Sequence, residues 1–207
     1  EDGIRDYKVT GVQTCALPIF LCVLAPRAWA VDGGIWAELA RVQKLQASFE
    51  QVQNRAVLKV PLTSHGTVSF ERARSALVWT VADPARSTFS LIGNVAKMEY
   101  PDLGMKETID LAQVPDASRL ASSMLVWMQA DATAVARDFA VTYGADFASL
   151  VPKDTTLKAL LAEIRIRFAN GPARVREVDL VEPDGDKVHI VFRGVTLDGV
   201  PVPDPTG

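Results

Sequence analysis

The sequence predicts an α+β fold: a curled antiparallel sheet of about nine to eleven strands, with about three helices that lie across its mouth as a lid and enclose an apolar space. Apolar residues alternate in short segments between residues 64 and 101 and again between 164 and 192, which is typical of antiparallel strands. Two other segments, 33–48 and 117–138, show helical spacing. A sheet of this many strands curls because its twist accumulates, and the helices then bury their apolar stripes against the concave face.

The first element is an amphipathic helix over residues 33–48, with Asp32 as its N-cap. An extended segment begins at Phe49 and runs to a turn before Gly66. The apolar positions that recur at helical spacing are Ile35, Trp36, Leu39, Val42 and Leu45.

The stretch 64–101 is expected to form about four or five short strands, with turns at Asp83-Pro84 and Gly93-Asn94. Side chains two residues apart on a strand share a face, so each strand presents a bulky apolar row to one side. These rows either line a ligand cavity or pack as a solid core, and both alternatives stay open at this point. The candidate cavity-wall residues are Phe70, Trp79, Phe89, Leu91, Met98 and Tyr100.

A further strand follows at 106–111, and the pattern then changes at Pro115 to a helix over residues 116–130 and a second short helix at 131–138. Methionine has an unbranched, polarisable side chain that suits a surface accepting chains of varied shape, although such a stripe also packs as ordinary core. The candidate lid-helix residues are Leu120, Met124, Trp127 and Met128.

The C-terminal part is mostly β-structure. Residues 139–143 alternate as a strand, and residues 153–163 carry helix formers for about one or two turns. Alternation then resumes over 164–168 and continues through a hairpin signal at 183–186 into a strand at 188–192. The Pro-rich tail from residue 195 is expected to lie along the surface or to fray.

Charge and composition exclude several classes of function. The net charge is −3 and no run of basic residues stands out, so nucleic acid is not an expected partner. No apolar stretch is long enough for a transmembrane helix. The two histidines, His65 and His189, have no G-x-S-x-G elbow or close ligand cluster around them, so we expect no catalytic site, no metal and no cofactor.

The N-terminus reads as two segments that precede the folded chain. Residues 20–30 combine a short apolar run with the small-x-small ending Ala28-Trp29-Ala30, which indicates the back half of a secretory signal peptide. Leu21 before Cys22 is not a small residue, which argues against a lipid-anchored lipoprotein. Residues 1–19 resemble a translated sequencing adapter and are expected to be non-native, which leaves 31–207 as a single soluble, exported domain.

Between Leu39 and Val195 seven segments follow one another in a characteristic order and spacing. They are LQASFEQ (45–51), GTVSF (66–70), LVWTVADP (77–84), MEYPD (98–102), SMLVW (123–127), VTYGADFASLVPKD (141–154) and EPDGDKVHIVF (182–192). In these segments the sequence resembles the LolA family of periplasmic outer-membrane lipoprotein carriers, as a divergent member. The resemblance implies an unclosed β-barrel whose helices form a lid over an apolar cavity for acyl chains. It also implies a soluble periplasmic monomer that takes an acylated lipoprotein or lipid from an inner-membrane donor transporter to an outer-membrane acceptor.

The same resemblance implies an arginine that holds the lid shut. In the family an Arg-Pro pair precedes the tryptophan that matches Trp79, and the arginine hydrogen-bonds the lid. The corresponding stretch here is Glu71-Arg72-Ala73-Arg74, without a proline, so Arg72 or Arg74 is a possible lid latch, or neither is. This departure keeps two alternatives open: an accessory protein for glycolipids or other acylated products, and a non-transporting interaction module with a solid core.

Overall fold

The computed structural model describes residues 33–113, 128–169 and 174–203. Its first half is one helix followed by a run of strands. In chain order these elements are α1 (Ile35–Arg41), β1 (Lys44–Asn54), β2 (Leu62–Glu71), β3 (Ala76–Asp83), β4 (Ser87–Ile92), β5 (Val95–Tyr100) and β6 (Met105–Asp110), with short 3-10 turns η1 (Arg72–Arg74), η2 (Pro101–Leu103) and η3 (Leu111–Gln113).

The second half adds two short helices and the remaining strands. They are α3 (Ala132–Asp138), β7 (Phe139–Tyr143), β8 (Phe147–Pro152), α4 (Thr155–Lys158), β9 (Glu163–Phe168), β10 (Val175–Val181), β11 (Lys187–Leu197) and β12 (Val200–Pro201).

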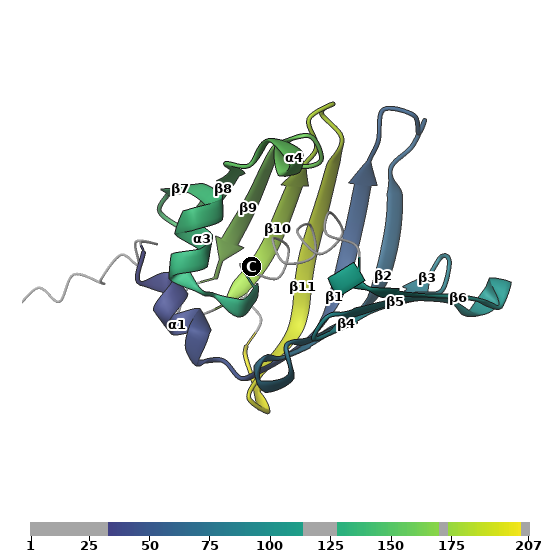
Figure 1. The fold of residues 1–207 in the computed structure, drawn as a ribbon, viewed down its shortest axis with the longest axis horizontal. Helices are drawn as coiled ribbons and strands as arrows, with labels where there is room; N and C mark the ends of the chain where they lie inside the picture. The colour runs from purple at the N-terminus through teal and green to yellow at the C-terminus, as the bar shows by residue number, and fades with distance from the viewer. Residues whose placement is uncertain (1–32, 114–127, 170–173, 204–207) are drawn as a thin grey trace, which may run out of the picture.

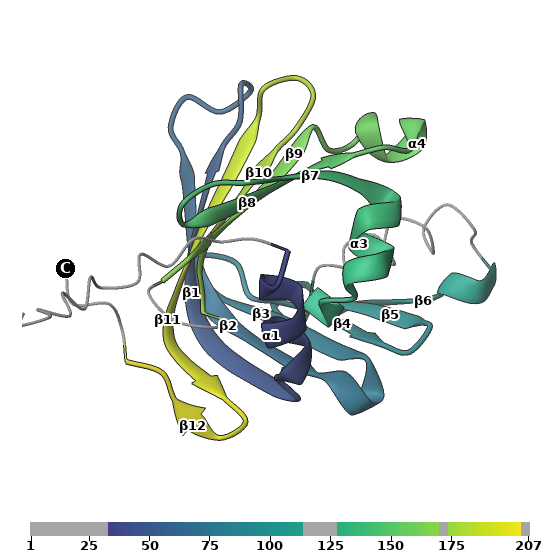
Figure 2. The same ribbon diagram turned by 90° about the vertical axis from the view of Figure 1, so that its left-hand side faces the viewer.

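The twelve strands of the described residues belong to one antiparallel sheet, in the order β6-β5-β4-β3-β2-β1-β11-β10-β9-β8-β7, with β12 beside β11. β6 and β7 are the two ends of this order, so the sheet is curled but not closed (Figure 1). Figure 2 shows α1 and α3 on the concave side of the sheet. The predicted unclosed antiparallel barrel with helices is therefore confirmed.

The concave face carries the apolar core because alternate residues of each strand point to the same side. Directly paired residues share a face, so one apolar layer continues from strand to strand. α1 adds the buried Ile35 and Trp36, and α3 adds Val135. Buried members of this layer on the strands include Phe49, Val68, Phe70, Leu77, Leu91, Ile164, Ile166, Val178 and Ile190.

Gly66 allows the closest approach within this layer. A Cβ atom at Gly66 would clash with the backbone carbonyl oxygen of Thr80 on the neighbouring strand β3 and would lie 2.7 Å from the ring of Phe49, which packs directly over this glycine. The same ring stacks on Trp79, with ring centroids 4.1 Å apart and planes at 27°. The absence of a side chain at Gly66 thus sets the position of two aromatic rings on the concave face.

The helix expected over 33–48 is wrong in its C-terminal part, because β1 already begins at Lys44. Leu45, expected on the helical stripe, instead pairs with Phe70 on one side and Leu197 on the other. β1 has a strand on both sides, so its backbone N–H and C=O groups are paired in the sheet. This pairing outweighs the weak helical preference of a few residues.

Three smaller differences concern strands and turns. The turn expected directly before Gly66 lies earlier, at residues 55–61, and β8 fills a segment for which no separate strand was expected. The tail from residue 195 does not only lie along the surface, since β11 runs to Leu197 and β12 pairs back onto it. Backbone pairing thus extends the sheet beyond the segments whose side chains alternate clearly.

Several predictions lie outside the described residues. These are the leader at 20–30, the segment 1–19 and most of the helix over 116–130. The N-cap expected at Asp32 is wrong, because α1 begins at Ile35 and its N-cap is Gly34. The second short helix, at 131–138, is confirmed as α3. The Asp131 side chain caps it by accepting hydrogen bonds from the backbone N–H groups of Thr133 and Ala134.

We predict that Gly66→Ala lowers the free energy of unfolding by about 3 kcal/mol or more, because the added methyl group would clash with the backbone carbonyl of Thr80 and displace the Phe49 ring. Urea unfolding of the purified protein measures this loss. Gly33→Ala is the matched control, since among the described residues the nearest atom to a Cβ there is the Tyr143 hydroxyl oxygen at 3.8 Å. Equal stability of the two variants would contradict the packing described for Gly66.

Candidate functional site

Arg72 connects the sheet to the helices that lie across it. Its Nε donates to the Val42 carbonyl at 2.8 Å and its Nη2 to the Leu39 carbonyl at 3.0 Å, both at the C-terminal end of α1. Its Nη1 donates to the carbonyl of Gln129, and its guanidinium lies 5.6 Å from the centre of the Phe70 ring. One planar side chain therefore binds three backbone carbonyls from two separate segments.

The position suits a cation. The last carbonyls of a helix carry partial negative charge and have a lone pair left for a further donor. The Leu39 carbonyl accepts from the Val42 N–H at 3.1 Å and also from Arg72, and the Val42 carbonyl accepts from Arg72. Burial lowers the pKa of Arg72 because it disfavours the charged form, while the charge of Asp198 acts in the opposite direction. An arginine remains protonated in proteins despite such a shift, so Arg72 keeps all its donors.

Arg74 has no comparable role in the structure. Its side chain is 64% exposed and its ion pair is with Glu71, at 3.9 Å on the same turn. Of the two arginines that the sequence left open, the fold therefore brings Arg72 to the helices and leaves Arg74 in solvent.

α1 is also held at its N-terminal end. The Trp36 indole Nε1–H donates to the Tyr143 hydroxyl at 2.7 Å, and Tyr143 belongs to the edge strand β7. This bond and the Arg72 bonds place α1 across the concave side, between the β7 edge and the η1 turn. Both ends of α1 are thus fixed by polar contacts of identified side chains.

The candidate wall residues differ in burial. Phe70 and Leu91 are fully buried, while Trp79, Phe89 and Met98 are half-buried. Trp79 is paired with Phe89, and Phe89 in turn with Met98, so these three form a row across β3, β4 and β5. The half-buried row combines apolar surface with access from outside, as a ligand-binding wall requires.

Tyr100, the sixth candidate, is exposed and lies at the end of β5, beyond this row. On the lid side, Met128 is half-buried and packs against the core. Leu120, Met124 and Trp127 lie outside the described residues.

Two aromatic residues near Trp79 were not candidates from the sequence. Phe49 stacks on Trp79, and Phe192 meets it edge to face at 6.3 Å. Phe49 and Phe192 are directly paired across β1 and β11, which join distant parts of the chain. Local alternation identified Phe192 as a strand residue, but only this long-range pairing brings it to Trp79.

The arginines at 165 and 167 lie on the opposite, outer face, where they pair with carboxylates. Arg165 lies 2.9 Å from Glu163, and Arg167 lies 3.1 Å from Glu177. His189 belongs to the same network and contacts Asp179 at 2.6 Å. The first pair lies along β9 and the other two join neighbouring strands, and such pairs on a partly exposed face stabilise the sheet modestly.

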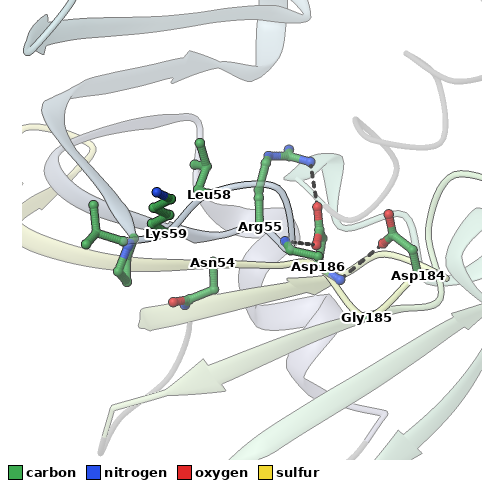
Figure 3. A pocket seen from close by; sticks show the side chains of 10 residues that line it. Asn54, Arg55, Leu58, Lys59, Asp184, Gly185 and Asp186 are labelled. Carbon is green, nitrogen blue, oxygen red and sulfur yellow. Dashed lines mark hydrogen bonds and ion pairs between the residues drawn. The ribbon is translucent and has the colours of Figure 1, made fainter.

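A pocket of about 410 Å³ lies between the β1–β2 loop and the β10–β11 turn (Figure 3). Arg55 binds Glu182 at 3.0 Å and Asp186 at 3.4 Å, and the Ala56 backbone N–H donates to Asp186 at 2.7 Å. Asp184 completes a group of three carboxylates whose oxygens lie within 4.8 Å of one another. Because Arg55 pairs with two of the three carboxylates, we interpret this group as a contact that joins the two hairpins.

Most of the chain matches one known protein family. The family model described as "Outer membrane lipoprotein carrier protein LolA" matches residues 40–204. The chain belongs to the LolA family. A search of curated protein sequences finds no match.

Solved structures similar to this LolA-family chain have low sequence identity to it. A chain of the Pseudomonas aeruginosa MucA/MucB complex is 14% identical with a TM-score of 0.46, over 83% of this chain and 59% of that one. A LolA superfamily protein from Nitrosomonas europaea is 9% identical with a TM-score of 0.40, over 79% and 92%. The Mycobacterium tuberculosis lipoprotein LppX is 10% identical with a TM-score of 0.42, over 80% and 96%.

The described part of this LolA-family chain contains no helix that is both long and apolar enough to cross a membrane.

Proposed function

We propose that this chain is a soluble periplasmic carrier that shields the acyl chains of a lipoprotein or lipid during transfer toward the outer membrane. The observation that supports it most is the half-buried row of Trp79, Phe89 and Met98 on the concave face of the sheet. Membership in the LolA family, described as outer membrane lipoprotein carriers, supports the same proposal.

Binding in this proposal comes from the burial of acyl methylene groups, each worth about 0.8 kcal/mol. The protein competes with the donor membrane and then with an acceptor, so transfer needs only modest differences in affinity between them. We therefore propose an inner-membrane donor transporter and an outer-membrane acceptor as partners, and no chemical step on the lipid.

Arg72 is the proposed lid latch. A hydrogen bond from a charged donor contributes on the order of 1.5–3 kcal/mol, so three such bonds strongly favour the position of α1 and of the Gln129 segment seen here. Opening the lid breaks these bonds and exposes the half-buried row to a ligand. The Arg72 hydrogen bonds therefore control whether a ligand can reach the row of Trp79, Phe89 and Met98.

We predict that Trp79→Arg lowers the affinity for a fluorescent fatty acyl probe at least about tenfold, because it places a charge in the apolar wall. Fluorescence titration measures this affinity. Val78→Arg is the matched control, since Val78 is the next residue of β3, is also half-buried, and faces the outer side of the sheet. Undiminished binding by Trp79→Arg would remove Trp79 from the proposed site.

We also predict that Arg72→Leu speeds release of the bound probe about tenfold or more, since the carbonyls of Leu39, Val42 and Gln129 lose their shared donor. Stopped-flow dilution of the loaded protein into lipid vesicles measures the release rate. Arg74→Leu serves as the control and should release at the wild-type rate. If both variants behave like wild type, Arg72 is a structural contact and not a latch.

The full burial of Phe70 and Leu91 supports the alternative of an interaction module with a solid core. Mass spectrometry of protein purified gently from the periplasm distinguishes the two. For the carrier we expect co-purified lipid that is absent from Trp79→Arg. Protein free of lipid would favour the interaction module, and a co-purified glycolipid would indicate the accessory role in handling such products.

A further inference from the structure

The apolar concave face contains a polar position near the β1–β2 hairpin end of the sheet. Ser64 on β2 is directly paired with Gln51 on β1, and Gln51 is paired in turn with the buried Ile190 on β11. Ser64 is also in step with Val68 and Phe70 on β2, which belong to the core. Alternation along the strand and pairing across it both place Ser64 on the concave face.

The Ser64 hydroxyl is buried without a partner. The residue is only 4% exposed, and its Oγ has no hydrogen bond. The neighbouring Gln51 is half-buried, and its side-chain amide makes no hydrogen bond with the described residues, whereas Gln53 accepts one from Arg55. A buried hydroxyl without a partner is unfavourable, and most buried side-chain polar atoms have one.

We propose that Ser64, with Gln51 beside it, hydrogen-bonds the ester or amide carbonyl of an acyl chain held on the concave face. This inference rests on the proposed carrier function and adds the polar end of the ligand to it. A serine hydroxyl donates to a carbonyl oxygen, and a carbonyl is the one acceptor that every acyl chain carries where it joins the rest of the molecule.

The direction of the acyl chain follows from the strand. Val68 lies four residues after Ser64 on β2, about 14 Å further along the concave face. Val68 is paired with Trp79, which begins the half-buried row of Trp79, Phe89 and Met98. A carbonyl bound at Ser64 therefore places the methylene groups on the way to this row, while the remainder of the ligand lies toward the β1–β2 loop.

Ser64→Ala tests this assignment through two effects of opposite sign. In the ligand-free protein the melting temperature should rise by a few degrees, because an unpaired buried hydroxyl is removed. Affinity for methyl palmitate, measured by displacement of N-phenyl-1-naphthylamine, should fall about three- to tenfold. Affinity for heptadecane, which lacks the carbonyl, should stay the same. Ser69→Ala, on the outer face of the same strand, should change neither affinity.

A second measurement needs no variant. The carbonyl band of ¹³C-labelled methyl palmitate bound to the wild-type protein should move to lower wavenumber than in an alkane solvent, as hydrogen bonding requires. An unshifted band, or an equal loss of affinity for both ligands in Ser64→Ala, overturns the role of Ser64. If neither ligand displaces the dye from the wild-type protein, the carrier function itself fails and this inference with it.

Discussion

The pairing of β1 with β11 is the contact on which the rest of the fold depends. The chain forms two series of antiparallel neighbours, β1 to β6 and β7 to β11, and these join only where β1 meets β11 among the described strands. The pairing runs from Leu45–Leu197 to Asn54–Lys187. It creates one curved face from two half-sheets and brings Phe192 beside Phe49 and Trp79. Without it, neither half would enclose the helices.

A few side-chain contacts hold the short helix α1 across the concave face of the sheet. It has seven residues, too few to be stable as an isolated helix, so its position depends on tertiary contacts. Ile35 and Trp36 supply buried apolar area, Tyr143 accepts a hydrogen bond at one end, and Arg72 donates at the other. The apolar contacts favour packing of α1 against the concave face of the sheet, and the polar contacts determine where on that face the helix lies.

The local sequence pattern was enough to predict the class of fold, the strands β3 to β6 and the C-terminal hairpin, because alternating side chains and turn residues identify each of these strands separately. It failed where pairing with distant strands decides, as for residues 44–48, which have helical spacing but join β1. The same reason explains why Phe49 was missed as a neighbour of Trp79. The choice between Arg72 and Arg74 likewise depends on the turn geometry of η1, which composition does not reveal.

Arg72 binds its three partners through main-chain oxygens alone. Every amino acid has a main-chain carbonyl oxygen, so these hydrogen bonds do not depend on which side chains α1 and the Gln129 segment carry. In the proposed carrier, the side chains of those segments that face the lipid can therefore change while the attachment to Arg72 stays the same, so that a related protein can bind a different lipid. Only changes that move the backbone itself, such as a proline or an insertion next to Leu39 or Gln129, would separate the guanidinium from its acceptors.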